Sequence, residues 1–352
     1  MPAKVAPMDF RPLPIVIIGA GGIVRSAHLP AYAKVRFPVF AVADPVPGRA
    51  TEVAMEFGVD RAFESVEDCI RAAPREVVFD VAVPASQLLS VIPLLPDGAA
   101  VLLQKPMGES LAEARAIRDL CRAKHLTAAV NFQLRFAPTM LQARALHERG
   151  ILGTLHDMEV QVRTLMPWAQ WTFLASAPRL EVLYHSIHYI DLVRSWLGNP
   201  IAVYGKTVRN PSTPTLQATK SVIVMDYGEW KRAFIATNHN YRFGDEMERA
   251  FVQWEGTEGA MRATLGVILD YPKGKPDELR YSTALHPHWK NELVSGHWFP
   301  DAFAGVMGSL QAYVEGAIDT LPTCVDDAYQ TMQVVEAFYR ASEGNPEPIR
   351  WD

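Results

Sequence analysis

An apolar run that ends abruptly in glycines constrains the fold more than any other feature of this chain. Residues Ile15 to Ile18 suit a strand that is buried on both faces, as in a parallel sheet. Gly19 and Gly21 allow the backbone to turn tightly and to approach a pyrophosphate without a Cβ in the way. A helical pattern follows, and free N–H groups at a helix N-terminus favour phosphate. The sequence therefore predicts a dinucleotide-binding turn, with Val24 in place of the third small residue of the usual motif.

A second apolar strand, Val39 to Ala43, ends in Asp44, 25 residues after Gly19. This spacing places the Asp44 carboxylate where it would accept hydrogen bonds from an adenosine ribose. An ionised carboxylate there would repel the 2′-phosphate of NADP, so we expect NAD as the cofactor. Arg49 is near enough in sequence to offset a phosphate, which keeps NADP possible. The alternative interpretation is that Asp44 only opens a turn with Pro45.

Strands alternate with helices as far as about residue 130, a pattern typical of a doubly wound parallel sheet. From about Gly153 the chain has longer β-rich segments separated by turns, so we expect neighbouring strands there to be antiparallel. Two helices, 298–315 and 325–342, are expected to close this second part. The sequence predicts an α/β protein with a Rossmann NAD(P)-binding domain over residues 10–130 and an α+β domain over 131–352.

Composition excludes several classes of function. The chain has 352 residues with 49% hydrophobic residues, enough for two domains of ordinary size. Its formal net charge of -5, with both signs interspersed, argues against a nucleic-acid partner. The three cysteines are widely spaced, which disfavours a zinc knuckle or a disulfide framework. Prolines interrupt the N-terminal segment, so we expect neither a signal peptide nor a membrane span, and we expect a cytoplasmic protein.

A lysine follows the fourth predicted strand, where Val101 to Leu103 runs into Gln104-Lys105-Pro106. Ligands of open α/β sheets bind outside the carboxyl ends of the strands. Pro106 cannot continue the strand and favours an extended conformation for the residue before it. We therefore expect Lys105 to point from the sheet edge to where a nicotinamide and a substrate would meet. The alternative is a surface lysine before a turn.

Several motifs together resemble the Gfo/Idh/MocA family of sugar and cyclitol oxidoreductases, and the resemblance covers nearly the whole chain. The motifs are His28-Leu29-Pro30-Ala31 after the glycine turn, Ala43-Asp44-Pro45, Gln104-Lys105-Pro106, Arg135-Phe136-Ala137-Pro138, Gly150-Ile151-Leu152-Gly153 and His188-Tyr189-Ile190-Asp191-Leu192. The resemblance implies a nucleotide domain followed by a large open, mostly antiparallel sheet that binds substrate. It also implies a homodimer or homotetramer assembled through that sheet.

The resemblance also implies a reaction centre. In the family, the lysine of a Glu-Lys-Pro motif acts with an Asp and a His that are four residues apart, which gives Lys105 and His188 here. The aspartate does not carry over, because Tyr184 occupies its position. Gln104 replaces the usual glutamate, and Val83-Pro84-Ala85 replaces a Thr-Pro-Asn segment.

Physical chemistry suggests roles for these groups. His188 is the natural base, because an imidazole exchanges a proton near neutral pH. Lys105 would hydrogen-bond the same substrate oxygen and stabilise a developing alkoxide. Tyr184 and His185 share a helical face with His188, so Tyr184 is a candidate donor and His185 an alternative base.

Two other interpretations of the histidines remain open. His185 and His188 would chelate a metal if Asp191 or Glu181 joined them, but further ligands cannot be identified and we predict no metal. Alternatively, both histidines are simply hydrogen-bonded and packed between the domains.

Aromatic rings near the histidine helix suggest how a substrate is held. Trp168 and Trp171 would stack on the C–H face of a sugar ring, or else fill a hydrophobic core or a subunit contact. Arg135 either contacts substrate or anchors the domain junction. The candidate substrate contacts are Lys105, Arg135, Trp168, Trp171, His185 and His188. The candidate cofactor contacts are Gly19, Gly21, Gly22, Ile23, Asp44, Arg49, Pro84, Gln104, Lys105 and Asn131, the last of these beside the nicotinamide.

These features predict an NAD-dependent dehydrogenase or reductase that acts on a secondary hydroxyl or keto group of a sugar, cyclitol or related polyol. Two alternatives stay open at this point. One is a glycoside hydrolase that uses NAD without net redox change. The other is a catalytically silent dinucleotide-binding regulator.

Overall fold

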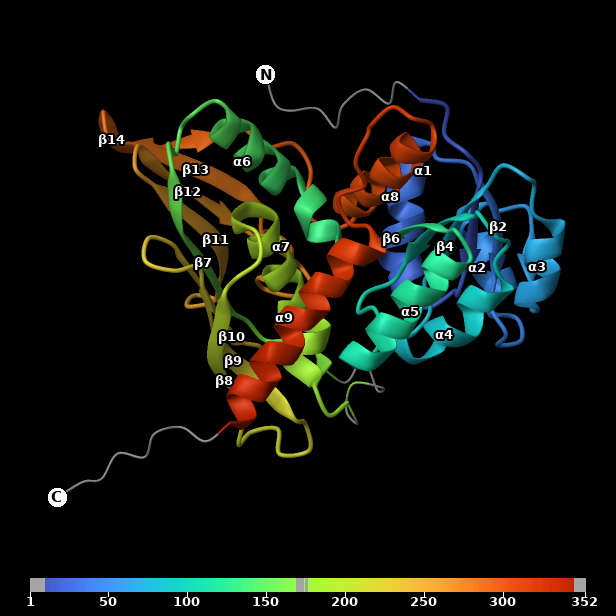
Figure 1. Ribbon diagram of the computed structural model, residues 1–352, viewed down its shortest axis with the longest axis horizontal. Coiled ribbons are helices and arrows are strands. Elements are labelled where there is room, and N and C mark those ends of the chain that lie inside the picture. Colours follow the sequence, from blue (N-terminus) through green and yellow to red (C-terminus); the bar gives the residue numbers. More distant parts are fainter. Residues whose placement is uncertain (1–9, 169–173, 175–176, 345–352) are drawn as a thin grey trace.

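The N-terminal sheet is parallel throughout, as the alternating pattern predicts. The computed structural model describes residues 10–168, 174 and 177–344. Six strands lie in the order β3-β2-β1-β4-β5-β6 (Figure 1). Their bounds are β1 Ile15–Ile18, β2 Val39–Ala43, β3 Ala62–Phe63, β4 Val78–Val81, β5 Ala100–Leu103 and β6 Thr127–Val130. The pairings Ile18↔Ala43, Ile18↔Val81, Val81↔Leu103 and Leu103↔Val130 align the carboxyl ends of five strands at one edge.

Helices cover both faces of this sheet, because its apolar strands are buried on both sides. They are α1 Leu29–Val35, α2 Arg49–Phe57, α3 Val66–Ala72, α4 Leu88–Val91 and α5 Leu111–Ala123, with a π-helical turn at Val24–His28 before α1. Ser110 caps α5 by accepting a hydrogen bond from the Glu113 N–H. The Glu113 carboxylate in turn accepts from the Glu109 N–H.

The second sheet has eight strands in the order β14-β13-β12-β11-β7-β10-β9-β8. Their bounds are β7 Leu155–Arg163, β8 Ala202–Arg209, β9 Ala218–Asp226, β10 Arg232–Asn238, β11 Arg249–Gly256, β12 Gly259–Thr264, β13 Glu278–Thr283 and β14 His286–Glu292. Neighbouring strands are antiparallel, as expected, except that β7 and β10 are parallel. This exception arises because a helix and a hairpin separate the two strands in sequence, which gives the chain room for a crossover connection.

Helices cover one face of the second sheet. They include α6 Pro138–Glu148, α7 Ile187–Leu197 after a π-helical turn at Val182–Ser186, and α9 Val325–Glu343. The helix α8, Asp301–Val314, does not pack as we expected. It lies against α1 and β5 of the N-terminal sheet, where Phe303, Met307 and Leu310 enter that domain's core. The apolar side chains of α8 thus pack into the Rossmann domain, although α8 comes after the second sheet in the sequence.

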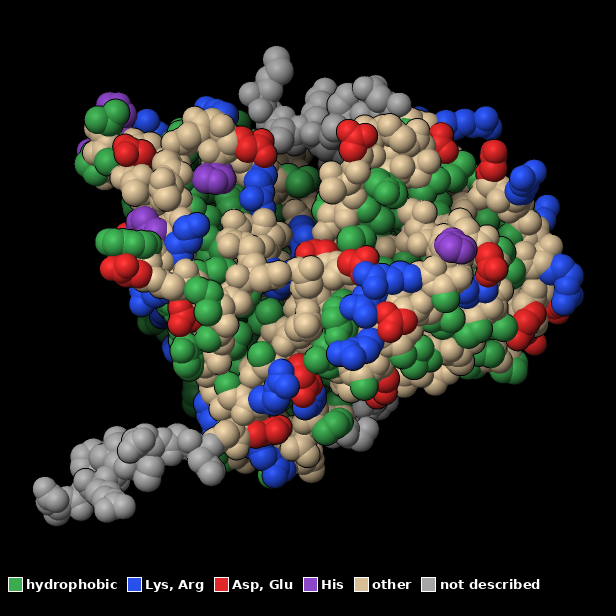
Figure 2. Space-filling view, viewed as in Figure 1, with side chains coloured by type: hydrophobic (Ala, Val, Ile, Leu, Met, Phe, Trp, Pro, Cys, Tyr) green, Lys and Arg blue, Asp and Glu red, His purple; other side chains and the backbone are tan. Residues whose placement is uncertain are grey.

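The two sheets are joined by α9, which crosses the molecule between them (Figure 1). It packs against α5 and β6 on one side and against β8 and α7 on the other. In the visible face of the space-filling view, acidic and basic side chains are interspersed (Figure 2). Over the described residues, none of the helices combines the length and the apolar character needed to traverse a bilayer.

Candidate active site

The glycine turn after β1 is open on the side that a dinucleotide would occupy. Gly19 has φ +102°, and a Cβ there would lie 2.6 Å from the Ala82 carbonyl oxygen. A Cβ at Gly21 or Gly22 would meet nothing within 4 Å. The first helical bonds run from the Val24 N–H and the next residue to the Gly21 carbonyl. The N–H groups of Gly21, Gly22 and Ile23 therefore lie at the helix start, where phosphate is favoured.

Asp44 lies beside this turn, at the end of β2. Its carboxylate accepts hydrogen bonds from the Ala20 N–H at 2.8 Å and the Val46 N–H at 2.9 Å. Arg49 Nη1 lies 3.4 Å from the same carboxylate. The hydrogen bond from the Val46 N–H forms a turn that starts at Asp44, which is the alternative role considered for Asp44 in the sequence. The bond to Ala20 holds the Asp44 carboxylate beside the glycine turn.

Lys105 joins the two domains. Its Nζ donates a hydrogen bond to the Tyr184 carbonyl oxygen at 2.8 Å. Burial lowers the pKa of Lys105 to about 8. The lysine thus follows β5 at the sheet edge, and its Nζ contacts the turn that leads into the helix carrying His188.

His188 lies in the first turn of α7, buried between two aromatic rings. The ring centroids of Phe132 and Trp298 are 6.4 and 6.0 Å away, both edge-on. Burial, followed by the charges of Lys105 and His185, lowers the pKa of His188 well below its usual value. The lowered pKa favours the neutral imidazole, which is the form that accepts a proton.

His185 faces a different set of neighbours. Its ring centroid is 5.1 Å from that of Trp168 and 5.0 Å from that of His239. Burial first, then His239 and Lys105, lowers the pKa of His185. Trp168 is itself held in place, because its Nε1 donates to Asn240 Oδ1 at 3.0 Å. Trp171, the other predicted aromatic contact, lies outside the described residues.

The Tyr184 phenol is bonded to a carboxylate of the N-terminal domain. Its hydroxyl donates to Glu109 Oε1 at 2.6 Å, while its backbone carbonyl faces Lys105. Burial and the neighbouring Glu109 raise the pKa of Tyr184 beyond the range of proton exchange at neutral pH. The π-helical turn at Val182–Ser186 inserts one extra residue per turn and so alters the expected i, i+4 face.

A buried carboxylate behind His185 was considered in the sequence only as a metal ligand. Glu181 accepts from Ser186 Oγ at 2.5 Å and lies 3.3 Å from His239 Nε2. Burial alone raises the pKa of Glu181, but hydrogen bonds and the charge of His239 outweigh it, and the pKa is lowered. Across 10–168, 174 and 177–344, no three His, Cys, Asp or Glu side chains are grouped so as to hold a metal ion. His239 is distant in sequence, and no local pattern would have identified it.

Arg135 anchors the domain junction. Its guanidinium donates to both oxygens of Asp191 at 2.6 and 2.5 Å, and to Asp327 in α9 at 2.5 Å. It also donates to the Pro322 carbonyl oxygen. These contacts favour the anchoring interpretation over substrate contact, and they also occupy Asp191, one of the residues considered as a metal ligand.

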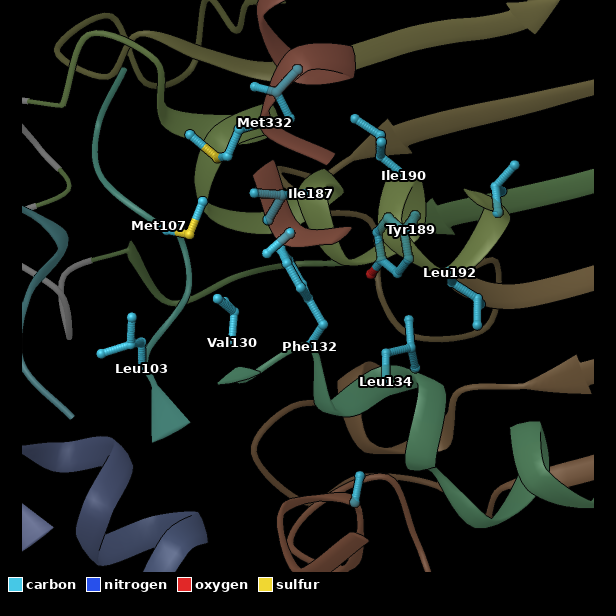
Figure 3. Packing of buried hydrophobic residues seen from close by; sticks show 14 of the residues in the cluster. Leu103, Met107, Val130, Phe132, Leu134, Ile187, Tyr189, Ile190, Leu192 and Met332 are labelled. Atoms are coloured by element: carbon cyan, nitrogen blue, oxygen red, sulfur yellow. The ribbon is translucent and has the colours of Figure 1, made fainter. Parts of the chain in front are cut away.

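The remaining candidates lie at the carboxyl ends of β4, β5 and β6. Pro84 follows β4 and precedes a short 3₁₀ turn. Gln104 Oε1 accepts a hydrogen bond from the Lys105 N–H at 2.9 Å, and Asn131 follows β6. Apolar side chains from these strand ends and from α7 meet between the domains, where Figure 3 labels Leu103, Val130, Phe132 and Ile187. Their close packing fixes the two halves of the site relative to each other.

Comparison with known proteins agrees with this geometry. A family model described as an oxidoreductase family with an NAD-binding Rossmann fold matches residues 13–132. Residues 13–132 therefore belong to the NAD-binding part of the Gfo/Idh/MocA oxidoreductase family. Distant relatives in the family act on sugars, inositol and diols according to their names.

Two relatives and one solved structure illustrate the range of the family. The chain is 25% identical to a D-apiose dehydrogenase of Paraburkholderia graminis over 77% of this chain and 72% of the relative. It is 24% identical to the NAD(+)-dependent scyllo-inositol 2-dehydrogenase of Bacillus subtilis over 48% of this chain and 50% of the relative. An Agrobacterium radiobacter oxidoreductase, solved with NAD+, L-tartaric acid and magnesium, has TM-score 0.78 and 19% identity, covering 94% of this chain and 96% of its own. That similarity concerns the fold.

Proposed function

We propose that this protein is an NAD-dependent dehydrogenase or reductase acting on a secondary hydroxyl or keto group of a sugar, cyclitol or related polyol. One observation carries the proposal: Lys105, at the edge of the parallel sheet, donates a hydrogen bond to the Tyr184 carbonyl in the turn that leads into the helix bearing His188. Burial first, and then the charge of Lys105, lowers the pKa of His188. These observations support a proton acceptor and a cation near the carboxyl ends of the strands, where ligands of such sheets bind. We further propose that residues 10–130 hold the cofactor and residues 131–352 hold the substrate.

The residues divide the chemistry between them. When bound, NAD supplies the acceptor for the hydride that leaves the substrate carbon. Neutral His188 takes the hydroxyl proton as the C–O bond becomes a carbonyl, and the Lys105 ammonium donates a hydrogen bond to the same oxygen. In the reverse direction His188 returns the proton. His185 serves as an alternative base, and Trp168 beside it offers a ring against which a sugar face would stack.

The cofactor would lie along the open glycine turn. Gly19, Gly21, Gly22 and Ile23 provide the pyrophosphate contacts, while Pro84, Gln104 and Asn131 border the nicotinamide end. Asp44 favours NAD, because its carboxylate lies beside the turn with only the half-exposed Arg49 to offset a 2′-phosphate. Asp44→Ala should weaken NAD binding far more than NADP binding, as measured by quenching of protein fluorescence. Equal weakening of both cofactors would reduce Asp44 to a turn residue.

A substrate screen tests the proposed reaction. Sugars, inositols and sugar acids would be supplied with NAD or NADP while the absorbance of the reduced cofactor is followed. Release of NADH with an oxidised polyol supports the proposal and excludes a redox-neutral hydrolase. Cofactor binding without turnover of any polyol, in either direction, would favour the silent regulator instead.

We also propose that the protein assembles as a homodimer or homotetramer through its second sheet. Helices cover only one face of that sheet. The other face carries a row of paired side chains, Tyr204, Val224 and Phe234, next to Val222, which is 50% exposed. Apolar surface of this extent on a sheet is typical of an interface.

A further inference from the structure

A buried polar network lies inside the Rossmann domain, directly behind the strand ends of the proposed site. Asp80 is in the middle of β4, between apolar neighbours, and is 1% exposed. Its Oδ2 lies 2.6 Å from His28 Nδ1 and accepts the Tyr32 hydroxyl at 2.7 Å. A carboxylate at this depth requires such partners, because burying it alone is costly.

The hydrogen bonds determine which nitrogen of His28 carries the proton. Gln104 Oε1 is fixed as an acceptor, because its partner is the Lys105 backbone N–H, which only donates. The Gln104 amide nitrogen therefore faces His28 Nε2, at 3.2 Å, as a donor. His28 Nε2 must accept this hydrogen bond, so the ring is neutral, with its proton on Nδ1 and directed at Asp80.

The same argument fixes the orientation of Asn131. Its Nδ2 lies 3.4 Å from His28 Nε2, and an accepting nitrogen requires a donor there. The Oδ1 of Asn131 is then directed away from His28. Asn131 is 1% exposed, and its Oδ1 has no hydrogen-bond partner within the described ranges.

We propose that His28 is a positioning residue for the cofactor end of the site. Locked by Asp80 and Tyr32, it orients two amides at neighbouring strand ends. The Gln104 side-chain oxygen then accepts the Lys105 N–H and holds the backbone of Lys105 in place. The buried Oδ1 of Asn131 is left to accept a hydrogen bond, and the primary amide of nicotinamide would donate it. The last step rests on the proposed function, whereas the orientation of the three side chains does not.

The proton position is tested directly by NMR. Histidine labelled with ¹⁵N in the full-length protein distinguishes neutral tautomers and the imidazolium through its long-range ¹⁵N–¹H couplings, and His28→Gln identifies the His28 signals. We expect His28 to be neutral with its proton on Nδ1 at pH 7. A proton on Nε2, or an imidazolium, would overturn the inference whatever the protein catalyses.

Gln104→Glu is the matched perturbation. A glutamate still accepts the Lys105 N–H but has no donor for His28 Nε2, so we expect His28 to take up a second proton. An unchanged His28 signal in folded Gln104→Glu would contradict the network. Tyr32→Phe, which removes one bond to Asp80 and leaves the ring's other partners in place, should keep the neutral tautomer.

Cofactor affinity tests the positioning role. His28→Leu removes the acceptor at Nε2, and we expect NAD to bind roughly tenfold more weakly, the worth of about one hydrogen bond. His28→Gln retains a side-chain oxygen for the two amides and should stay close to wild type. Asn131→Ala should match His28→Leu, and the double variant should lose little more, because the two residues act as one unit.

Each outcome decides between explanations. Additive losses in the double variant, or full NAD affinity in folded His28→Leu, would overturn the positioning role. Should His28→Leu fail to fold, the NAD affinity of Asn131→Ala, expected to be roughly tenfold weaker, is compared with that of His28→Gln, expected to be close to wild type; full NAD affinity in folded Asn131→Ala would then overturn the nicotinamide contact. Wild-type protein that binds no NAD, but shows the predicted tautomer, would refute the proposed function and the nicotinamide contact and leave the network intact.

Discussion

Lys105 is the single side chain on which the proposed chemistry most depends. Lys105→Met keeps much of the side chain's length and removes its charge, so the oxygen of the substrate loses a charged donor. We expect kcat to fall by about 10²–10⁴, the usual contribution of such a group, with NAD affinity nearly unchanged. Lys273→Met, at a lysine that is 82% exposed, is the matched control and should behave as wild type. A turnover number unaltered in Lys105→Met would refute the role.

The shifted pKa values of two residues predict a bell-shaped pH profile for kcat/KM in the oxidation direction. His188 acts as a base only when neutral, and its pKa is lowered, so activity should fall only below the ordinary histidine value of about 6.5. Lys105 acts as a cation, and its pKa is lowered to about 8, so activity should fall again as pH rises through about 8. Lys105→Met should abolish the alkaline limb and retain the acid limb. Persistence of the alkaline limb in that variant would assign it to another group.

At the scale of elements, a buried carboxylate lies at the start of the π-helical turn before α7. Glu181 is wholly buried; it accepts a hydrogen bond from Ser186 Oγ and lies 3.3 Å from His239 Nε2. Glu181→Gln removes a buried charged acceptor, and a hydrogen bond to a charged group contributes about 1.5–3 kcal/mol. We expect the free energy of unfolding, measured by urea denaturation, to fall by about that amount.

A surface pair provides the control for this substitution. Glu52, which is 71% exposed, pairs with Arg25. Glu52→Gln should change stability by less than about 1 kcal/mol. If the two variants proved equally stable, Glu181 would be protonated or solvated, contrary to its lowered pKa.

Elements also differ in how far the sequence predicts them. The longer parallel strands are predictable because each is a short, largely apolar run followed by a turn, whereas β3, Ala62–Phe63, is too short to show such a pattern. Lys105 and His188 can be proposed from the sequence because each lies in a local motif. The packing of α8 on the Rossmann domain and the parallel pair β7 and β10 depend on contacts between distant segments, so no local pattern contains them. The bond from the Tyr184 phenol to Glu109 cannot be predicted from the sequence, because it joins distant segments and a π-helical turn changes the helical period around Tyr184.

One missed group did leave a signal. Asp80 is a charged residue in the middle of an apolar strand, and a buried carboxylate implies a buried partner. The sequence does not say that the partner is His28, because the two residues meet only when α1 packs on the sheet.

At the scale of the whole molecule, the bare face of the second sheet predicts an oligomer. Val224→Glu places a charge between its register partners Tyr204 and Phe234, and burying it against apolar side chains is unfavourable. We expect sedimentation equilibrium to show a dimer or tetramer for wild type and a smaller species for Val224→Glu. Met55→Glu, at an 80% exposed position on α2, should leave the mass unchanged. A monomeric wild type would refute the proposed assembly.

The helix α9 packs against both the parallel sheet and the second sheet. Near its start, Arg135 donates hydrogen bonds to Asp191 and to Asp327 of α9. A hinge motion that separated the two domains would break the contacts of α9 with one of them. It would also leave the buried charges of Arg135 and its carboxylate partners unpaired. We therefore expect the angle between the two sheets to change little when cofactor and substrate bind.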